Sequence, residues 1–479
     1  MVLNTKEKQE AVLKKLQKRL TLTVDQAGHA IAIKKRNGNP ETHRIQATSF
    51  RKIIINMARS LDLTLSRREI ESIQLALCDT AEASDNSVNV YLRVAAIENG
   101  IELDVGNKEQ TRIRLTPSKV KVITKGSETF FYRPSAMQPF VMPSKKGNLD
   151  LIYKYLNFDD EQAWLLIVWI CYTLSTPRAS DTNYPILVLI AEQGAAKSTT
   201  CKLIIRSLLD PSQLGIQGFP SNRQDMVLAA NHAHILIYDN LRYLSSKWSD
   251  TLCIASTGGN DPTRKLYTDG ELMNHPFQVP LVLNGIHDFI EEPDLAQRCL
   301  RLELNSIAER DRRDEREFTK EFNTDLPKIF KGLLDLTADI LKKLPKAKVT
   351  HPQRMLGYVR YLAATEKALK MKSGRLQAVY SDILNDAQLD SVLENPLASA
   401  VLDMMQARTE WNGTPSELLT EITEDLTSYD LLRRSLPTNP ISLSKRLNAL
   451  KSPLRSQQIN IFFTRGKERR ISITNLESI

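Results

Sequence analysis

Hydrophobic and polar positions along this chain predict an α/β fold. Residues 186–190 form a continuous apolar run of the kind found in buried parallel strands, and further strands are predicted at 233–238, 279–283 and 300–304. The segment that follows Lys197 instead carries apolar residues at helical spacing. We therefore expect a central domain in which buried parallel strands alternate with helices.

The first 145 residues show a mixed α+β pattern. A basic amphipathic helix is predicted at 5–20, and two further helices at 50–63 and 66–83. Strands are predicted at 29–35, 88–106 and 111–124. This region contains no recognisable catalytic constellation, so we interpret it as a DNA-binding or oligomerisation region. The Pro-rich stretch 134–146 is interpreted as a linker.

Composition indicates a cytoplasmic protein. The chain is 42% hydrophobic and 25% charged, as globular proteins are. The five cysteines form no CxxC pair and the seven histidines no close set, which argues against a disulfide framework or a zinc site. The longest apolar stretch, 163–174, lies in a predicted helix at 149–175 and is too short to cross a membrane. We therefore expect no membrane partner.

Basic charge is concentrated at the two ends of the chain. The net charge is +9 and the pI about 9.1. Residues 1–20 hold six basic and two acidic residues, net +4, and residues 441–479 hold eight and two, net +6, so the remainder sums to −1. Basic ends indicate contact with nucleic acid, although solvated surface lysines would give the same count.

The segment 184–200, YPILVLIAEQGAAKSTT, has the order of a P-loop: a strand, a loop of small residues, Lys-Ser, and a helix. In such a loop, backbone N–H groups and the helix start hold the phosphates of ATP, Lys197 reaches the β- and γ-phosphates, and Ser198 ligates Mg²⁺. The predicted ATP-binding residues are Glu192, Gln193, Gly194, Ala195, Ala196, Lys197, Ser198 and Thr199.

The loop departs from the usual glycine pattern. Ala191 and Ala196 stand where glycines are common, and alanine disfavours positive φ angles. An ordinary strand-to-helix turn that happens to contain a lysine is therefore the alternative interpretation.

Polar residues flank the later strands in the order that an ATPase requires. Asp239 and Asn240 follow 233–238 as in a Walker B motif, where Asp239 would hold the water shell of Mg²⁺. Asn284 follows the next strand and can position the attacking water. Arg298 precedes the last strand and can reach a neighbouring subunit's nucleotide. Each residue alone fits an ordinary turn, but their order supports a catalytic set.

Residues 391–479 predict a winged-helix domain. Helices are expected at 395–411, 415–426 and 443–450, and strands at 459–463 and 470–474. Ser442 would cap the third helix. The predicted DNA contacts are Lys445, Arg446 and Asn448 in the groove, and Arg465, Lys467 and Arg469 on phosphates. A winged helix that packs against protein is the alternative.

Together these motifs resemble the AAA+ ATPases. They are most similar to the MCM-like and superfamily 3 (D5-like) replicative helicases of bacterial mobile elements and phages. In MCM proteins a small non-glycine residue precedes the P-loop lysine, as Ala196 does here. Residues 256–267, STGGNDPTRKLY, resemble the GGD…R-x-LY segment of D5-like helicases and would begin a β-hairpin. Residues 349–368 resemble the MCM lid, in which Arg354 would be the sensor 2 residue.

The resemblance covers roughly residues 146–385. Together with the patterns at the two ends of the chain, this resemblance predicts four parts: an α+β region at 1–145, an AAA+ P-loop ATPase core at 146–345, a helical lid at 346–390, and a winged helix at 391–479.

Two features depart from the resemblance. Asn240 stands where an acidic residue usually polarises the attacking water, and Glu192 or Asp250 would have to replace it. The tip of the expected hairpin is acidic. Its DNA contacts are therefore predicted on the first arm, at Arg264 and Lys265.

The resemblance implies an ATP- and Mg²⁺-dependent helicase that forms a ring, expected to be a hexamer, on single-stranded and forked DNA. Element-encoded or host replication proteins are its expected partners. One alternative is a slowly hydrolysing initiator switch that binds origin DNA and recruits a host helicase. Another is an ATP-driven defence or regulatory assembly that uses the same core on a different partner.

Overall fold

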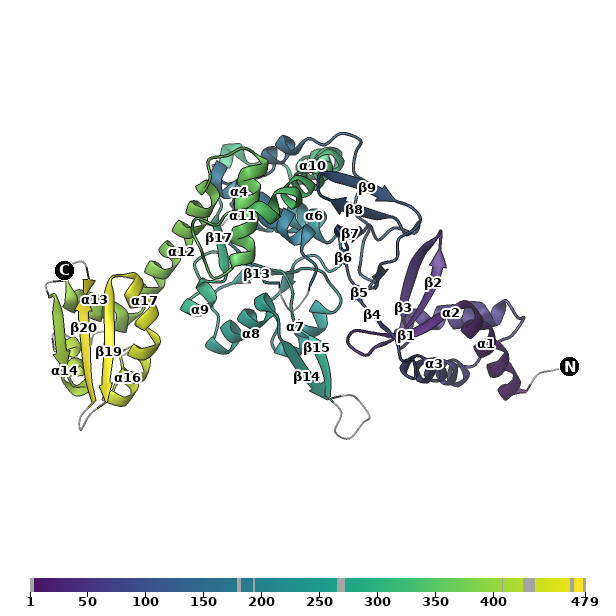
Figure 1. Cartoon of the computed structure of the whole chain (residues 1–479), viewed down its shortest axis with the longest axis horizontal. Coiled ribbons are helices and arrows are strands. Elements are labelled where there is room, and N and C mark those ends of the chain that lie inside the picture. The colour runs from purple at the N-terminus through teal and green to yellow at the C-terminus, as the bar shows by residue number, and fades with distance from the viewer. Residues whose placement is uncertain are drawn as a thin grey trace.

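The computed structural model describes residues 4–178, 182–192, 194–264, 272–406, 408–424, 436–465 and 469–476. Three parts follow one another along the longest axis in Figure 1: an N-terminal part, a central body, and a C-terminal part reached through helix α12 (Arg375–Glu394). Within the described residues, no helix combines the length and hydrophobicity that a membrane span requires.

The central body contains a five-stranded parallel sheet in the order β12-β13-β16-β11-β17. The strands are β11 (Ile186–Ile190), β12 (Gln217–Gly218), β13 (Leu236–Leu241), β16 (Leu281–Gly285) and β17 (Cys299–Glu303). The four strands predicted for this domain supply all of these strands except the short β12. Every residue of β11 is buried, as expected for a strand at the interior of a sheet with both faces covered.

The central body also contains helices, which pack on this sheet, on a second sheet and on one another. They are η1 (Leu149–Lys154), α4 (Asp160–Ser175), α5 (Lys197–Thr199), η2 (Thr200–Ile205), α6 (Arg206–Leu209), α7 (Arg223–Ala230), α8 (Ser246–Thr257), α9 (Pro293–Ala296), η3 (Glu309–Asp311), α10 (Glu315–Lys343), η4 (Leu344–Lys346) and α11 (Leu356–Ala368). The apolar helix α4 is capped by the side chain of Asp159 and is buried in the same hydrophobic core as α10 and α11. Burial on all sides explains why α4 is apolar around its whole circumference.

The N-terminal part packs three helices against a four-stranded sheet in the order β3-β2-β1-β4. Its elements are α1 (Thr5–Arg19), β1 (Thr21–Asp25), β2 (Ala30–Arg36), β3 (Asn39–Arg44), α2 (Thr48–Arg59), α3 (Arg67–Glu82) and β4 (Ser87–Val88). The three predicted helices and the strand at 29–35 are confirmed. Strands β1 and β3 were not predicted from the sequence because their residues carry few apolar side chains; both pair with β2, and β1 also pairs with β4.

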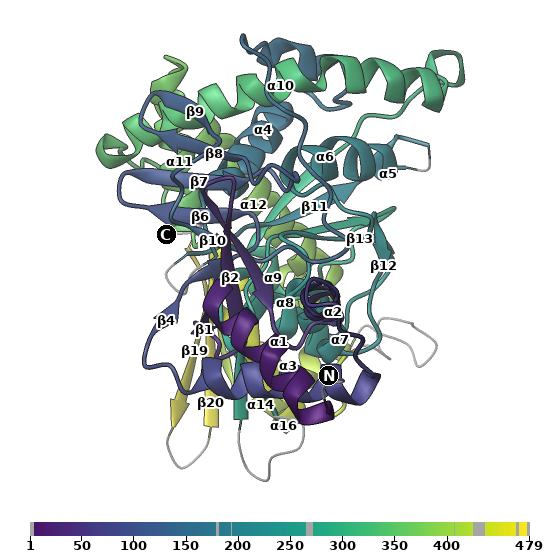
Figure 2. The same ribbon diagram turned by 90° about the vertical axis from the view of Figure 1, so that its right-hand side faces the viewer.

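A second antiparallel sheet, β6-β7-β8-β9, belongs to the central body. Its strands are β6 (Val94–Ile97), β7 (Gly100–Asp104), β8 (Arg112–Thr116) and β9 (Lys119–Ile123), and a separate pair is formed by β5 (Val90–Tyr91) and β10 (Phe130–Phe131). Gly100 is required at the first turn: its φ is +155°, and a Cβ there would lie 2.0 Å from the carbonyl oxygen of Leu115. The buried residues of this sheet share one hydrophobic core with β11 and α10, and Figure 2 shows α10 beside it.

The Pro-rich stretch 134–146 is packed, so its interpretation as a linker is wrong. The buried Phe140 stacks on Phe330 with ring centroids 5.2 Å apart, and its N–H donates to the carbonyl of Val105 at 2.8 Å. The N–H of Ser144 donates to the carbonyl of Pro327 at 3.0 Å. Proline removes backbone donors and prevents regular structure, but it does not prevent burial of the apolar residues between the prolines.

The C-terminal part has a hydrophobic core of its own and a three-stranded sheet in the order β18-β20-β19. Its elements are α13 (Pro396–Met405), β18 (Glu410–Gly413), α14 (Pro415–Thr423), α16 (Pro440–Ala449), α17 (Lys451–Ser456), β19 (Ile459–Arg465) and β20 (Arg469–Asn475). Two expectations are corrected. The first helix ends at Met405, because Trp411 pairs with Ile473 in the sheet, and Asn439 rather than Ser442 caps α16.

Candidate nucleotide-binding site

The carboxyl ends of three neighbouring parallel strands bring the predicted ATP-site residues together. Strand β11 leads into the loop before Lys197, Asp239 lies near the end of β13, and Asn284 lies near the end of β16. All three residues line one cavity of about 640 Å³. Positions far apart in sequence converge here because parallel strands end at the same edge of a sheet.

The loop between β11 and α5 adopts the left-handed conformations that glycine usually supplies. Gly194 has a φ of 88° and Ala196 a φ of 63°. An L-residue in this region costs roughly 1–2 kcal/mol. Alanine therefore keeps the path of the loop but leaves strain at Ala196. Gln193 of the predicted set lies outside the described residues.

Lys197 folds back on its own loop. Its Nζ donates to the carbonyl oxygens of Ala191 and Glu192, the second at 2.9 Å. Partial burial lowers the pKa of Lys197 below its ordinary value. A phosphate in the loop would compete with two neutral carbonyls for the ammonium group, and the charged oxygens form the stronger hydrogen bonds.

Ser198 and Asp239 are placed to share a cation. The Ser198 Oγ donates to Oδ2 of Asp239 at 3.1 Å. Hydroxyl and carboxylate oxygens suit Mg²⁺, which usually takes one or two protein ligands and fills its other positions with water and phosphate oxygens. The pair therefore fits a magnesium ion that arrives with a nucleotide. Elsewhere in the described chain, no cluster of three or more His, Cys, Asp or Glu side chains could hold a metal by itself.

Asn240 and Asn284 are joined by a hydrogen bond close to the Ser198–Asp239 pair. Asn240 has a φ of 63°, and the β13–β16 register is irregular between Tyr238 and Leu241. This irregularity lets the Asn240 N–H donate to Oδ1 of Asn284 at 3.0 Å. The Nδ2 of the buried Asn284 donates to Sγ of Cys201 at 3.6 Å. Asn284 is therefore fixed by contacts on both ends of its amide.

A segment that the sequence analysis did not assign completes the cavity. It follows β17, which is paired with β11, and its lining residues are Ile307, Asp311, Arg312, Arg313, Glu315 and Phe318. The sequence signal is a run of nine consecutive charged residues at 309–317, which begins after a five-residue gap that follows β17. Such a run is usually solvated surface, so only the position of β17 beside β11 shows that it reaches the loop.

The carboxylates near the cavity differ from those expected to replace the missing acid. Of the described residues in its lining, Asp311 and Glu315 join Asp239 as carboxylates. Glu192 and Asp250 are exposed and lie outside that lining. Glu192 contributes its backbone carbonyl to Lys197.

Arg298 and Arg354 meet at a different place, on Asp294. Arg298 Nη2 lies 3.1 Å from Oδ2 of Asp294, and Nη1 of Arg354 binds its other oxygen. Burial would raise the pKa of Asp294, but the two guanidinium groups outweigh it and hold the pKa below its usual range. Arg298 precedes β17, so it lies at the amino edge of the sheet, opposite the cavity. Neither arginine lines the cavity in the described structure.

The candidate DNA-binding residues are only partly described. Strands β14 (Asn260–Arg264) and β15 (Leu272–Pro276) form the predicted antiparallel hairpin. Lys265 and Lys467 lie outside the described residues, as do the side chains of Arg264, Arg465 and Arg469. On α16, Lys445 and Asn448 are exposed and Arg446 is half-buried.

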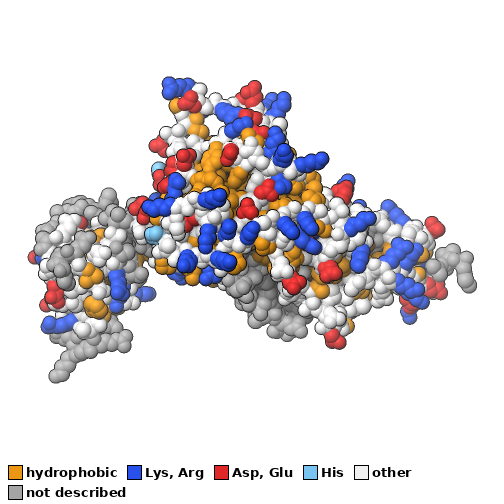
Figure 3. All heavy atoms as spheres, turned by 45° about the horizontal axis from the view of Figure 1, so that its top comes forward, with side chains coloured by type: hydrophobic (Ala, Val, Ile, Leu, Met, Phe, Trp, Pro, Cys, Tyr) orange, Lys and Arg blue, Asp and Glu red, His pale blue; other side chains and the backbone are white. Residues whose placement is uncertain are grey.

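Basic side chains are not confined to the chain ends on the surface. Lys and Arg are spread over the face of the central body and N-terminal part in Figure 3, with acidic residues between them. This face therefore carries mixed charge rather than one basic patch.

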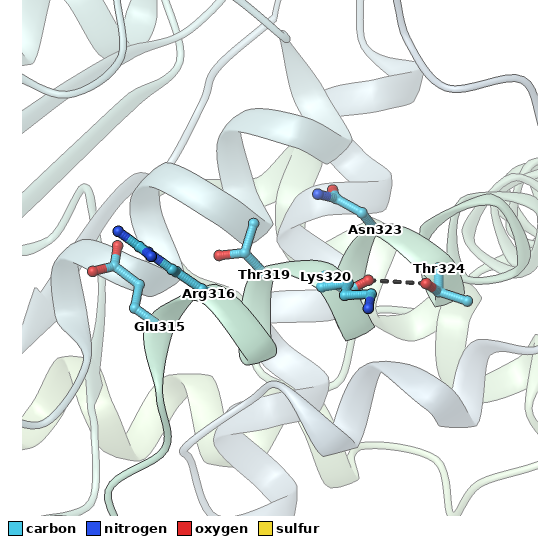
Figure 4. A pocket seen from close by; sticks show the side chains of 6 residues that line it. All are labelled: Glu315, Arg316, Thr319, Lys320, Asn323 and Thr324. Atoms are coloured by element: carbon cyan, nitrogen blue, oxygen red, sulfur yellow. Dashed lines mark hydrogen bonds between the residues drawn. The ribbon is translucent and has the colours of Figure 1, made fainter.

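A shallow depression elsewhere follows the outer face of α10 (Figure 4). Its lining residues are Glu315, Arg316, Thr319, Lys320, Asn323 and Thr324. All of them belong to one helix, and Thr324 Oγ1 donates to the carbonyl of Lys320 at 2.9 Å. Groups from different elements do not meet there in the described structure, so we assign it no chemistry.

Three solved structures align with the chain, and two of them are described as helicases. One, described as the active helicase Cch of SCCmec type IV, has a TM-score of 0.46 and 10% identity, over 96% of this chain and 94% of that one. The C-terminal region of NrS-1 gives 0.39 and 11%, over 97% and 98%. The JCV helicase gives 0.20 and 10%, over 47% and 64%. Likenesses this weak establish neither a shared fold nor a shared activity.

Sequence comparison with family models is more informative. No curated protein matches the chain. The model of the actinomycete integrative conjugative element replication protein, AICE RepA, matches residues 149–390. The model of the AICE RepA C-terminal domain matches residues 397–478. The first match contains the candidate nucleotide site, and the second contains the C-terminal part. With half of its length matched by the first model alone, the chain belongs to the family of actinomycete integrative conjugative element replication proteins.

Proposed function

We propose that this replication protein is an ATP-driven DNA helicase of the AAA+ type. The observation that carries the proposal is the pair Ser198–Asp239, 3.1 Å apart, in the cavity that Lys197 also lines. The parallel strand order supports it, because β11 lies between the strand that carries Asn284 and the strand that follows Arg298. The family assignment supplies the setting, replication of a mobile element.

In the proposed reaction, water attacks the terminal phosphate of ATP and releases ADP and inorganic phosphate. Lys197 would leave its two loop carbonyls and bind the β- and γ-phosphates. Magnesium, when held by Ser198 and Asp239, would neutralise charge on the phosphate oxygens. Asn284 would orient the water, and Asp311 or Glu315 would accept its proton, since Asn240 cannot.

The same geometry supports an oligomer as the active unit. Arg298 lies at the amino edge of the sheet and does not line the cavity of its own subunit. We propose that Arg298, and Arg354 beside it, stabilise charge on the nucleotide of a neighbouring subunit in a hexameric ring. Asp294 would hold both arginines until that neighbour is in place.

Hydrolysis would then drive strand separation. Opening duplex DNA costs about 1.4 kcal/mol per base-pair step in stacking, so strand separation requires energy from a reaction such as ATP hydrolysis. The β14–β15 hairpin would bind one strand of the DNA. The C-terminal part, as a winged helix, would bind DNA through Lys445 and Arg446.

The test is displacement of a strand from forked DNA with ATP and magnesium, with Lys197→Ala as the matched control. We expect displacement by the unchanged protein and none by the variant. In the described part of the chain, the Lys197 side chain donates its hydrogen bonds to carbonyls of its own loop, so the variant should unfold at about the same denaturant concentration. Displacement that persists in Lys197→Ala would contradict the site assignment.

One observation favours a second candidate function. Asn240 stands where related ATPases usually have an acidic residue, and its backbone N–H donates a hydrogen bond to the side chain of Asn284. A protein that binds ATP tightly but hydrolyses it slowly would act as an origin-binding switch that recruits a host helicase. ATP turnover that single-stranded DNA accelerates supports the helicase. Tight ATP binding without such turnover supports the switch.

A further inference from the structure

The charged segment after β17 places one guanidinium group against the loop that precedes Lys197. A Cβ placed on Gly194 would lie 3.3 Å from Nη2 of Arg312. Arg312 also lines the cavity with Lys197 and Asp239. The guanidinium therefore faces the space where a P-loop holds phosphates.

Arg312 differs from the arginines on either side of it. Arg313 binds Glu321 and lies over the ring of Phe318, 4.9 Å from its centroid. Arg310 lies 3.7 Å from Asp311 and is not among the described residues that line the cavity. Within the described residues, the guanidinium of Arg312 makes no hydrogen bond or ion pair. A cation held beside a phosphate loop without a protein partner is available to an anion.

We propose that Arg312 binds the phosphates of the nucleotide held by the same subunit. This inference rests on the proposed function. It assigns a residue that acts within the subunit and complements Arg298, which would act between subunits. The reason is topological: Arg312 follows β17 and so lies at the carboxyl edge of the sheet with Lys197, whereas Arg298 precedes β17 at the other edge. The planar fork of arginine suits two phosphate oxygens at once.

The first experiment compares binding of a fluorescent non-hydrolysable ATP analogue, with magnesium, by the full chain and three variants. Arg312→Ala should weaken binding roughly 10- to 100-fold, the usual value of a hydrogen bond to a charged group. Arg310→Ala removes the same charge from the same segment and should leave the affinity within about twofold. Arg312→Lys keeps the charge but loses the fork, so its affinity should fall between those of Arg312→Ala and the unchanged protein.

The second experiment mixes Arg312→Ala with Lys197→Ala and measures binding of the same analogue. If Arg312 acts within its own subunit, every site lacks one of the two cations and binding stays weak at all mixing ratios. Tight sites that appear on mixing would overturn the assignment, because they need the intact Lys197 of one subunit and the intact Arg312 of another.

The two hypotheses fail in different ways. If the unchanged protein does not bind the analogue, the proposed ATPase function fails. If the unchanged protein binds it and Arg312→Ala binds equally well, only the role of Arg312 fails. Thermal unfolding of each variant shows that a loss of binding is not a loss of fold.

Discussion

Replacing Arg93 by alanine should strongly destabilise the central body. This side chain is fully buried, and its Nε donates to Oδ1 of Asp210 at 2.8 Å. Its Nη2 donates to the carbonyl oxygens of Gln138 at 2.5 Å and Pro211 at 2.8 Å. Its guanidinium plane lies 4.7 Å from the centroid of Phe140. Arg93 thus joins the second sheet to the Pro-rich segment and to the end of the helix that starts at Lys197.

The magnitude follows from what remains after the truncation. Asp210 stays buried, with Arg206 as a more distant ion-pair partner at 3.7 Å. Breaking a buried pair by removing one partner costs about 3–5 kcal/mol. For a body of this size, each kcal/mol lowers Tm by about 2–4 °C, so the expected decrease is roughly 6–20 °C.

The assay is guanidinium and thermal unfolding of the full chain followed by circular dichroism. Arg67→Ala is the control, because Arg67 pairs with Glu71 at 2.9 Å on the surface, with its side chain 83% exposed. Exposed pairs contribute at most about 1 kcal/mol. A decrease in stability for Arg93→Ala no larger than that of the control would refute the reasoning.

The pH dependence of stability gives a second test of the role of Arg93. Burial would raise the pKa of Asp210, but the charges of Arg93, His234 and Arg206 outweigh it and hold that pKa below its usual value. A carboxyl with a lowered folded pKa contributes stability above its unfolded pKa and loses it as pH falls through the folded value. In Arg93→Ala the pKa of Asp210 rises, so the variant can protonate it. The difference in unfolding free energy between the unchanged protein and Arg93→Ala should therefore be largest near neutral pH and become smaller below about pH 4.

Three further predictions concern the proposed function. Mixing Arg298→Ala with Lys197→Ala subunits should restore part of the ATPase rate, because sites between unlike subunits contain both side chains; no recovery at any ratio would count against action between subunits. Replacing Asp311 and Glu315 together by their amides should lower kcat roughly 100-fold with little change in KM for ATP, as loss of a general base does, and an unchanged kcat in steady-state assays would exclude both. Lys445→Ala should weaken DNA binding and reduce the slope of log affinity against log salt by about one, and an unchanged slope would favour a protein-packing role for the C-terminal part.

Much of the local structure was predictable because it depends on local patterns. The segments that became β11, β13 and β16 were visible as largely apolar runs too short for helices, and β17 was predicted as a strand in which leucines alternate with charged residues. The hairpin at β14 and β15 was predicted from a family resemblance. Strands β1, β3 and β18 were missed because pairing with a neighbour, rather than their own residue pattern, makes them strands.

The sequence by itself determined the order of the strands along the chain and the residues that follow each one, including Lys197, Asp239 and Asn284. Only the tertiary structure decided which strands are neighbours. By placing β17 beside β11, it brought Arg312 to the loop of Lys197 and left Arg298 at the opposite edge. Hydrophobic periodicity is a property of consecutive residues, whereas strand order depends on contacts between residues more than 100 positions apart, which no local pattern records.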